Sequence, residues 1–292
     1  MKEITLDAYG KLNLTLDILG RRPDGYHDLR MVMQSVSLCD RVTIRETENG
    51  QIALRTSASY LPCDRGNLAY RAAEAFFAAV DVANPGVALY VEKRIPVCAG
   101  MAGGSADAAA VLRGLRRMYA PQLSVEELCR IGERVGSDVP YCVFGGTALA
   151  EGRGEILTRL APIPECWAVL CKPDFPISTP ELFGCVDAKK LTSHPDTPGM
   201  CESLERGDLN GVLRRVYNVF EAVLPEKYSE VFVIKDKLLD LGALSTCMTG
   251  SGPTVFGLFD NAAGAAQTAE RLRREYPQTF CAAMVNLGEQ FL

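Results

Sequence analysis

The sequence predicts a two-lobed α+β protein, and three observations lead to this fold class. The chain has 292 residues, a length that favours two cores of roughly 150 residues over a single one. Glycine-rich segments at residues 96–105 and 249–254 each adjoin a strand-like pattern. Beyond residue 158 the order of strands and helices changes. We therefore expect an N-terminal lobe over residues 1–158 and a C-terminal lobe over residues 159–292.

The first strand shows a strict alternation of apolar residues, at Leu12, Leu14, Leu16 and Ile18. A period of two predicts a strand with one buried face. Lys11 and Asn13 fall on the opposite face, so they project to the same side, about 7 Å apart along the strand.

The rest of the N-terminal lobe alternates between strand and helix patterns. After a turn at residues 23–25, strands are expected at residues 30–38, 41–46, 51–55 and 87–91, and helices at 68–82, from Ser105 and from Ser124. Glu127 stands three residues after Ser124, which is the spacing of a capping box.

The C-terminal lobe mixes the same two patterns in a different order. Strands are expected at residues 166–171, 254–259 and 279–286, and helices within 202–223, 226–241 and 262–275. Residues 189–200 are expected to form a surface loop or linker.

Composition excludes several classes of protein. The net charge of −5 argues against a nucleic-acid partner, because such proteins usually carry a basic stripe. No apolar run approaches the roughly 20 residues that a membrane span needs, and the strand pattern begins at once with Ile4 and Leu6, so we expect no signal peptide. The 11 cysteines include no C-x-x-C pair, which favours buried thiols in a reducing cytoplasm.

Residues 96–105 carry the clearest chemical signal. They lie between a strand and a helix start and are mostly small, so backbone amides can approach an anion at the positive end of the helix dipole. Ser105 could direct its hydroxyl to phosphates or to Mg²⁺. This is not a Walker A loop, because no lysine precedes Ser105. A glycine-rich turn that only brings a helix close to a sheet is the structural alternative.

A second glycine motif, residues 249–254, stands just before a strand. A tight turn would explain this motif alone. Two such loops without the spacing of a Rossmann motif favour a non-Walker nucleotide kinase over a dinucleotide enzyme.

Asp138 and Lys11 are the candidate catalytic pair. Asp138 follows a helix and precedes Pro140, so its carboxylate is a plausible general base for a hydroxyl nucleophile. Lys11 could offset the charge of the transferring phosphoryl group. A turn aspartate and a solvated strand lysine are the alternatives.

Three motifs, the Lys11 strand and the two glycine loops, together resemble the signatures of the GHMP kinases, in matching order across nearly the whole chain. Residues 8–14, 22–27, 136–140 and 151–155 are similar to the branch whose alcohol substrate carries a cytidine diphosphate. The resemblance implies a ribosomal-protein-like N-terminal lobe and a ferredoxin-like C-terminal lobe. It also implies phosphorylation of the 2-hydroxyl of a cytidine-diphosphate-linked methylerythritol, on the non-mevalonate route to isoprenoids, by a cytoplasmic monomer or weak homodimer.

The resemblance also implies the site residues. Lys11 and Asp138 would be catalytic, and Mg²⁺, with Ser105 as a candidate ligand, would accompany ATP. The ATP loop would comprise Pro96, Val97, Cys98, Ala99, Gly100, Met101, Ala102, Gly103, Gly104, Ser105 and Ala106. Substrate contacts would come from Asn13, Tyr26, His27, Thr179 and Phe183, with Tyr26, His27 and Phe183 holding the cytosine. The second glycine loop would contribute Gly250, Ser251 and Gly252.

The phosphate loop departs from the family pattern, which has glycine where Cys98 and Ala102 stand and leucine at Met101. Each added side chain limits how closely the backbone can approach a phosphate group. The departure therefore puts the affinity for the nucleotide in doubt. We expect the Cys98 thiol to be reactive and MgATP to protect it. The alternative is a thiol turned inward against the helix.

Three alternative functions remain at this stage. Another GHMP kinase would act on mevalonate, homoserine or a sugar, but would not need aromatic residues for a base. A catalytically silent nucleotide-binding regulator would not need Lys11 and Asp138. A nucleic-acid-binding module is disfavoured by the net charge.

Overall fold

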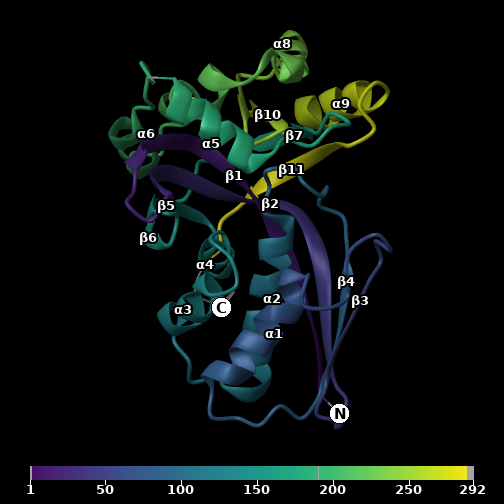
Figure 1. Ribbon diagram of the computed structural model, residues 1–292. Helices are drawn as coiled ribbons and strands as arrows, with labels where there is room; N and C mark the ends of the chain where they lie inside the picture. The colour runs from purple at the N-terminus through teal and green to yellow at the C-terminus, as the bar shows by residue number, and fades with distance from the viewer. Residues whose placement is uncertain (1, 190, 288–292) are drawn as a thin grey trace.

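The structure is a computed structural model that describes residues 2–189 and 191–287. Met1 and residues 288–292, at the ends of the predicted lobes, and Lys190, in the predicted 189–200 loop, lie outside the described residues. The strands form one extended sheet with the order β3-β4-β2-β11-β7-β10-β9, to which β1, β5, β6 and β8 are attached through β2, β5 and β1. Helices pack on this sheet in both lobes, which confirms the two-lobed α+β class (Figure 1).

A long antiparallel hairpin, β1 (Glu3–Arg21) and β2 (His27–Glu46), runs through the N-terminal lobe. The strands predicted at 30–38 and 41–46 are thus one continuous strand, β2. Its C-terminal half pairs with β4 (Val87–Glu92), which pairs with β3 (Ile52–Thr56). Its N-terminal half pairs with β5 (Thr147–Gly152), which pairs with β6 (Ile156–Arg159); sequence patterns did not predict β5 and β6.

Four helices complete this lobe: α1 (Leu68–Ala79), α2 (Gly103–Tyr119), α3 (Val125–Glu133) and α4 (Val139–Phe144). Helix α2 lies directly on the hairpin because it has a glycine at the crossing. A Cβ atom at Gly114 would lie 2.4 Å from Ile44 Cδ1 and 2.9 Å from Leu6 Cδ1. This close approach sets how near α2, whose first turn follows the phosphate loop, lies to the hairpin.

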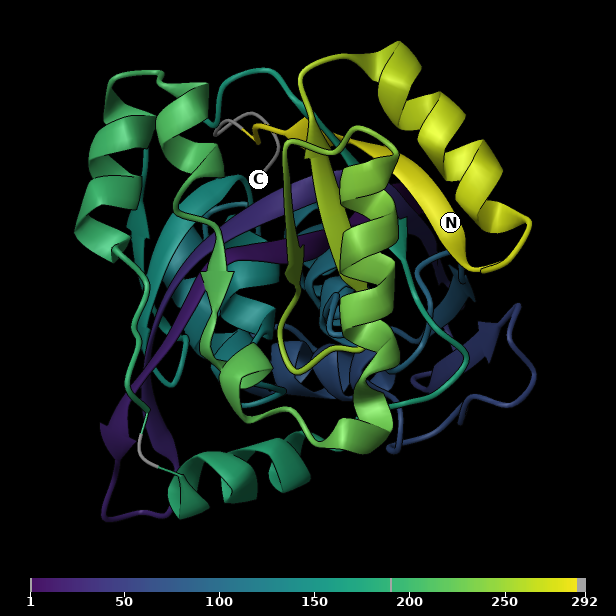
Figure 2. The ribbon, with the colours of Figure 1, turned by 90° about the horizontal axis from the view of Figure 1, so that it is seen from above.

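In the C-terminal lobe, β7 (Trp167–Cys171) pairs with β11 (Thr279–Val285) and with β10 (Val255–Phe259), and β10 pairs with the unpredicted strand β9 (Ser245–Met248). Helices α8 (Glu230–Asp240) and α9 (Ala262–Arg273) lie over the same face of these strands (Figure 2). Because β11 also pairs with β2, it joins the two lobes. The predicted boundary at 158 and 159 falls within β6 and stays a prediction.

The remaining elements of this lobe are short helices and one short strand. They are α5 (Thr179–Ala188), α6 (Thr197–Glu205), α7 (Leu209–Leu213), β8 (Tyr217–Asn218) and the 3-10 helices Val219–Val223 and Glu226–Tyr228. The predicted loop at 189–200 is therefore too long. Asp196 caps α6 by accepting a hydrogen bond from the Gly199 N–H, and the proline after Thr197 is favourable in the first helical turn.

The strand that carries Lys11 is buried on both faces, so the prediction of one buried face was wrong. Lys11, Asn13 and Thr15 are as inaccessible to solvent as Leu12 and Leu14. The reason is tertiary, because segments of the C-terminal lobe cover the polar face. The Asn13 N–H, for example, donates to Thr249 Oγ1 at 3.1 Å.

The capping box at the start of α3 gives a test of the local fold. Ser124 Oγ accepts from the Glu127 N–H at 3.1 Å, and Glu127 Oε2 accepts from the Ser124 N–H at 2.8 Å. We expect Ser124→Ala to lower the free energy of unfolding by about 1 kcal/mol and Tm by about 2–4 °C, as measured by calorimetry. Ser193→Ala, in the loop before α6, is the matched control, and an equal shift there would contradict the capping role.

Candidate active site

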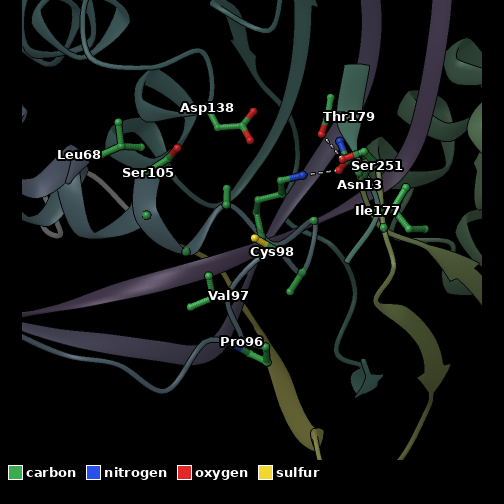
Figure 3. A pocket seen from close by; sticks show the side chains of 18 of the residues that line it. Asn13, Leu68, Pro96, Val97, Cys98, Ser105, Asp138, Ile177, Thr179 and Ser251 are labelled. Atoms are coloured by element: carbon green, nitrogen blue, oxygen red, sulfur yellow. Dashed lines mark hydrogen bonds between the residues drawn. The ribbon is translucent and has the colours of Figure 1, made fainter. Parts of the chain in front are cut away.

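A cavity of about 510 Å³ lies where the two lobes meet, and most of the predicted site residues line it (Figure 3). Those lining residues are Lys11, Asn13, Pro96, Val97, Cys98, Ala99, Gly100, Ala102, Gly103, Gly104, Ser105, Asp138, Thr179, Phe183, Gly250, Ser251 and Gly252. Met101 and Ala106 are buried and do not line the cavity. Tyr26 and His27 are also absent from its lining. One cavity therefore unites both glycine loops and the candidate catalytic pair.

The phosphate loop runs from the end of β4 to the first turn of α2. Its backbone is left-handed at three places, Cys98 (φ 52°), Gly100 (φ 70°) and Ala102 (φ 56°). Glycine adopts this conformation without steric cost, whereas a residue with a side chain pays roughly 1–2 kcal/mol. Cys98 and Ala102 therefore hold strain that glycine at these positions would release.

The two glycine loops touch through their backbones. A Cβ atom at Gly100 would lie 2.2 Å from the Thr249 carbonyl oxygen, and one at Gly250 would lie 2.8 Å from the Gly100 carbonyl oxygen. Asn218, which sequence reasoning missed, holds the second loop by donating from its amide to the carbonyls of Met248 and Gly250 at 2.7 and 2.8 Å. The loops thus form one wall of the cavity.

Lys11 is held at the junction of these loops. Its Nζ donates to Asn13 Oδ1 at 2.6 Å, and its backbone N–H donates to the Met101 carbonyl at 3.1 Å. Irregularities in the β1–β2 pairing flank this segment, and such bulges change the direction in which side chains point. Burial lowers the pKa of the Lys11 ammonium, and the negative charge of Asp138 partly offsets that effect.

Asp138 stands at the N-cap position of α4, a short helix that the sequence patterns did not predict. Its side chain makes no capping hydrogen bond, so the carboxylate is not committed to the helix end. Figure 3 shows Asp138 and Ser105 projecting toward the same space of the cavity. A carboxylate in this position can meet a hydroxyl group beside the phosphate loop.

The sequence reasoning missed a buried ion cluster beside the loop, two members of which, Lys93 and Asp107, line the cavity. Lys93 Nζ bridges the carboxylates of Asp40 and Asp107, at 2.7 Å from Asp107 Oδ2. Asp40 Oδ1 also accepts from the backbone N–H groups of Arg94 and Ile95, at the entry to the loop. Burial raises the pKa of Asp107, although the positive charge of Lys93 counteracts this. The cluster ties the entry of the loop to helix α2 at its exit.

One end of the cavity is apolar. It is lined by Leu61, Pro62 and Leu68, in and just after the segment that precedes α1. Apolar side chains beside a phosphate loop suit a heterocyclic base.

The aromatic residues that the sequence predicts to contact the substrate come from both lobes. His27 and Phe183 stack with ring centroids 4.6 Å apart, and Phe183 meets Phe220 edge-on at 5.1 Å. His27 Nε2 is 2.8 Å from Asp187 Oδ1 on α5. Thr179 at the start of α5 is 2.7 Å from Ser251 of the second glycine loop, hydroxyl to hydroxyl. Helix α5 is therefore fastened to both lobes.

Tyr26 lies apart from this group. Its side chain is 56% exposed, whereas that of its neighbour His27 is buried, because successive side chains of an extended segment point to opposite sides. The Tyr26 ring instead faces the Arg153 guanidinium, 5.3 Å from the ring centroid.

No group of three or more histidine, cysteine, aspartate or glutamate side chains suited to a metal occurs within residues 2–189 and 191–287. Mg²⁺ in kinases is commonly held by substrate phosphates together with only one or two protein ligands. The Ser105 hydroxyl faces the cavity and fits such a role. In the same part of the chain no helix has the length and apolar character of a membrane span.

The two lobes with their paired glycine loops define a small-molecule kinase of the GHMP class. The model of the GHMP kinase N-terminal domain matches residues 67–146, which contain the phosphate loop and Asp138, and the model of the GHMP kinase C-terminal domain matches residues 200–278.

Curated relatives narrow the class. The chain is 45% identical to 4-diphosphocytidyl-2-C-methyl-D-erythritol kinase of Lachnoclostridium phytofermentans, over 94% of this chain and 93% of the relative. It is 43% identical to the kinase of the same name from Brevibacillus brevis, over 98% of both chains. A crystal structure of 4-(cytidine 5'-diphospho)-2C-methyl-D-erythritol kinase superposes with a TM-score of 0.82 at 32% identity, covering 98% of this chain and all of that one. The chain belongs to the family of 4-diphosphocytidyl-2-C-methyl-D-erythritol kinases.

More distant structures share the fold alone. Homoserine kinase from Cytophaga hutchinsonii superposes with a TM-score of 0.74 at 16% identity, over 98% of this chain and 96% of that one.

Selective alkylation tests whether the phosphate loop is open to solvent. Cys63, Cys98 and Cys281 are exposed, which contradicts an inward-facing thiol at Cys98, but of these only Cys98 lines the cavity. We expect brief iodoacetamide treatment to label Cys98 and to abolish kinase activity, with MgATP protecting Cys98 but not the other two thiols, as measured by peptide mass spectrometry. Full labelling of Cys98 with activity retained would show that its thiol does not face the phosphates.

Proposed function

We propose that this chain transfers the γ-phosphoryl group of ATP to the 2-hydroxyl of 4-diphosphocytidyl-2-C-methyl-D-erythritol, a step of non-mevalonate isoprenoid synthesis. The observation that carries the proposal is the placement of Lys11 and Asp138 in the same cavity as both glycine loops. The curated relatives bearing that kinase name support the choice of substrate.

Asp138 acts on the acceptor hydroxyl in this proposal. Its carboxylate is free of a capping bond and can accept the hydroxyl proton as the oxygen attacks the phosphorus atom. The phosphoryl group moves from the β-phosphate oxygen of ATP to that alkoxide oxygen, and ADP leaves.

Lys11 offsets the charge that accumulates on the transferring group. Lys11 is almost fully buried, at 4% exposure, and a charge in such a water-poor site acts more strongly than it would in solvent. The bond to Asn13 fixes its direction before the substrate arrives.

The ATP polyphosphate binds along residues 96–105 and at the N-terminus of α2, where backbone N–H groups and the helix dipole favour an anion. The adenine base is placed in the apolar end of the cavity, between Leu61, Pro62 and Leu68. Mg²⁺, when bound, neutralises phosphate charge, with Ser105 as its candidate protein ligand.

The cytidine part of the substrate binds on the other side of Lys11. Phe183 lines the cavity, and its ring offers a stacking surface to a pyrimidine base. His27 supplies a polar edge beside it, Tyr26 contacts the base from the rim, and Thr179 and Asn13 line the path toward the acceptor hydroxyl. A substrate without a base would leave this aromatic group unused.

The catalytic assignment predicts specific losses of rate. We expect Asp138→Asn to lower kcat by about 10²–10⁴-fold, the usual range for loss of a general base, with ATP binding little changed. Lys11→Met should be similarly damaging. A coupled ADP-release assay that offers the cytidine substrate beside mevalonate, homoserine and galactose measures both activity and substrate class. An Asp138→Asn variant that retains more than about a tenth of wild-type kcat would contradict the base role.

The aromatic assignment predicts a change in KM for one substrate only. We expect Phe183→Ala and Tyr26→Ala to raise KM for the cytidine substrate about 5- to 150-fold, because each removes a stacking partner of the base. KM for ATP should stay nearly constant. If both KM values rise together, the lobe is disordered and the base contacts are not established.

A further inference from the structure

The motif at residues 151–155 takes no direct part in the proposed reaction. It forms the turn between β5 and β6, and its backbone is left-handed at Gly152 (φ 68°) and Gly154 (φ 112°). The Arg153 N–H, between them, donates to Glu155 Oε2 at 2.6 Å. The backbone of Arg153 is therefore fixed by a turn that requires glycine on either side.

The Arg153 side chain bridges two other elements. Its Nη2 is 3.0 Å from Glu133 Oε1 at the end of α3, and its guanidinium carbon lies 5.3 Å from the centroid of the Tyr26 ring. A planar guanidinium can keep its hydrogen bonds to a carboxylate while its face rests on an aromatic ring. Arg153 thus meets Tyr26 from a side chain that is already anchored.

Hydrogen bonds within the turn that carries Tyr26 hold its backbone in place. The Arg22 N–H donates to the Tyr26 carbonyl at 2.7 Å, and the Tyr26 N–H donates to Asp24 Oδ1 at 3.0 Å. These bonds set the shape of the turn but leave the exposed ring free to rotate about its side-chain bonds. The contact with Arg153 opposes that rotation.

Arg153 and Tyr26 also share a second cavity, of about 190 Å³, with Gly136 and Ser137. These two residues directly precede Asp138. The purple β1–β2 hairpin tip, β5 and β6 lie on one side of the molecule in Figure 1. The Arg153–Tyr26 contact therefore borders the segment that leads into Asp138, the candidate general base.

We propose that Arg153 is a positioning residue for substrate recognition: anchored by Glu133, it holds the Tyr26 ring in the orientation that contacts the cytosine. This inference rests on the proposed function, because it assigns the base contact to Tyr26. Arg153 itself takes no part in phosphoryl transfer. Its loss should raise KM for the cytidine substrate and leave kcat and KM for ATP within about twofold of wild type.

A double-mutant cycle tests this role with steady-state kinetics. We expect Arg153→Met to raise KM for the cytidine substrate about two- to fivefold, the effect of an exposed cation–π contact. The same change should have no further effect in a Tyr26→Ala background and its full effect in a Tyr26→Phe background, which keeps the ring. Arg153→Lys should restore part of the loss. Arg206→Ala, which removes a surface ion pair on α6, is the matched control.

The outcomes separate this inference from the proposed function. Additive effects of Arg153→Met and Tyr26→Ala, or an Arg153→Met enzyme with unchanged KM, would overturn the positioning role. An equal fall in kcat/KM for the cytidine substrate and for methylerythritol 4-phosphate, which lacks the base, would do the same, because Arg153 would then not act through base recognition. Failure of the wild-type enzyme to phosphorylate the cytidine substrate would overturn the proposed function itself.

Discussion

The backbone contact between the two glycine loops is the constraint on which the rest of the site depends. Gly100 and the segment at Thr249 and Gly250 approach so closely that no side chain fits between them. This contact joins a loop of the N-terminal lobe to a loop of the C-terminal lobe. Because Thr249 also accepts a hydrogen bond from the Asn13 backbone, the same contact closes the site over the strand that carries Lys11.

The phosphate loop holds strain, and its ends are correspondingly well anchored. Cys98 and Ala102 occupy backbone conformations that suit glycine. A strained backbone of this kind persists only where neighbouring contacts hold it in place. The ion cluster of Asp40, Lys93 and Asp107 supplies such contacts, because it joins the entry of the loop to α2. Because the loop is already held in one conformation, its backbone amides can bind a polyphosphate without the entropic cost of ordering the loop.

The aromatic residues proposed to recognise the substrate come from both lobes. His27 belongs to β2 and Phe183 to α5, and their rings meet only because β11 and the second glycine loop bring the two lobes together. Tyr26 lies outside the cavity between the lobes, and its ring faces the Arg153 guanidinium. Relative movement of the lobes would therefore alter the nucleotide and substrate sides together.

The sequence by itself determined the elements whose signals are local. Strand alternation from Leu12, the capping box at Ser124 and the small residues before Ser105 each depend on neighbours in the chain, and each lies where it was predicted. The short helix after Asp138 carries too few residues to show a period. Only the tertiary structure decided that Lys11 is buried and that Lys93 anchors the phosphate loop. The physical reason is distance along the chain, because burial and charge pairing at these positions come from segments such as Thr249, 236 residues beyond Asn13.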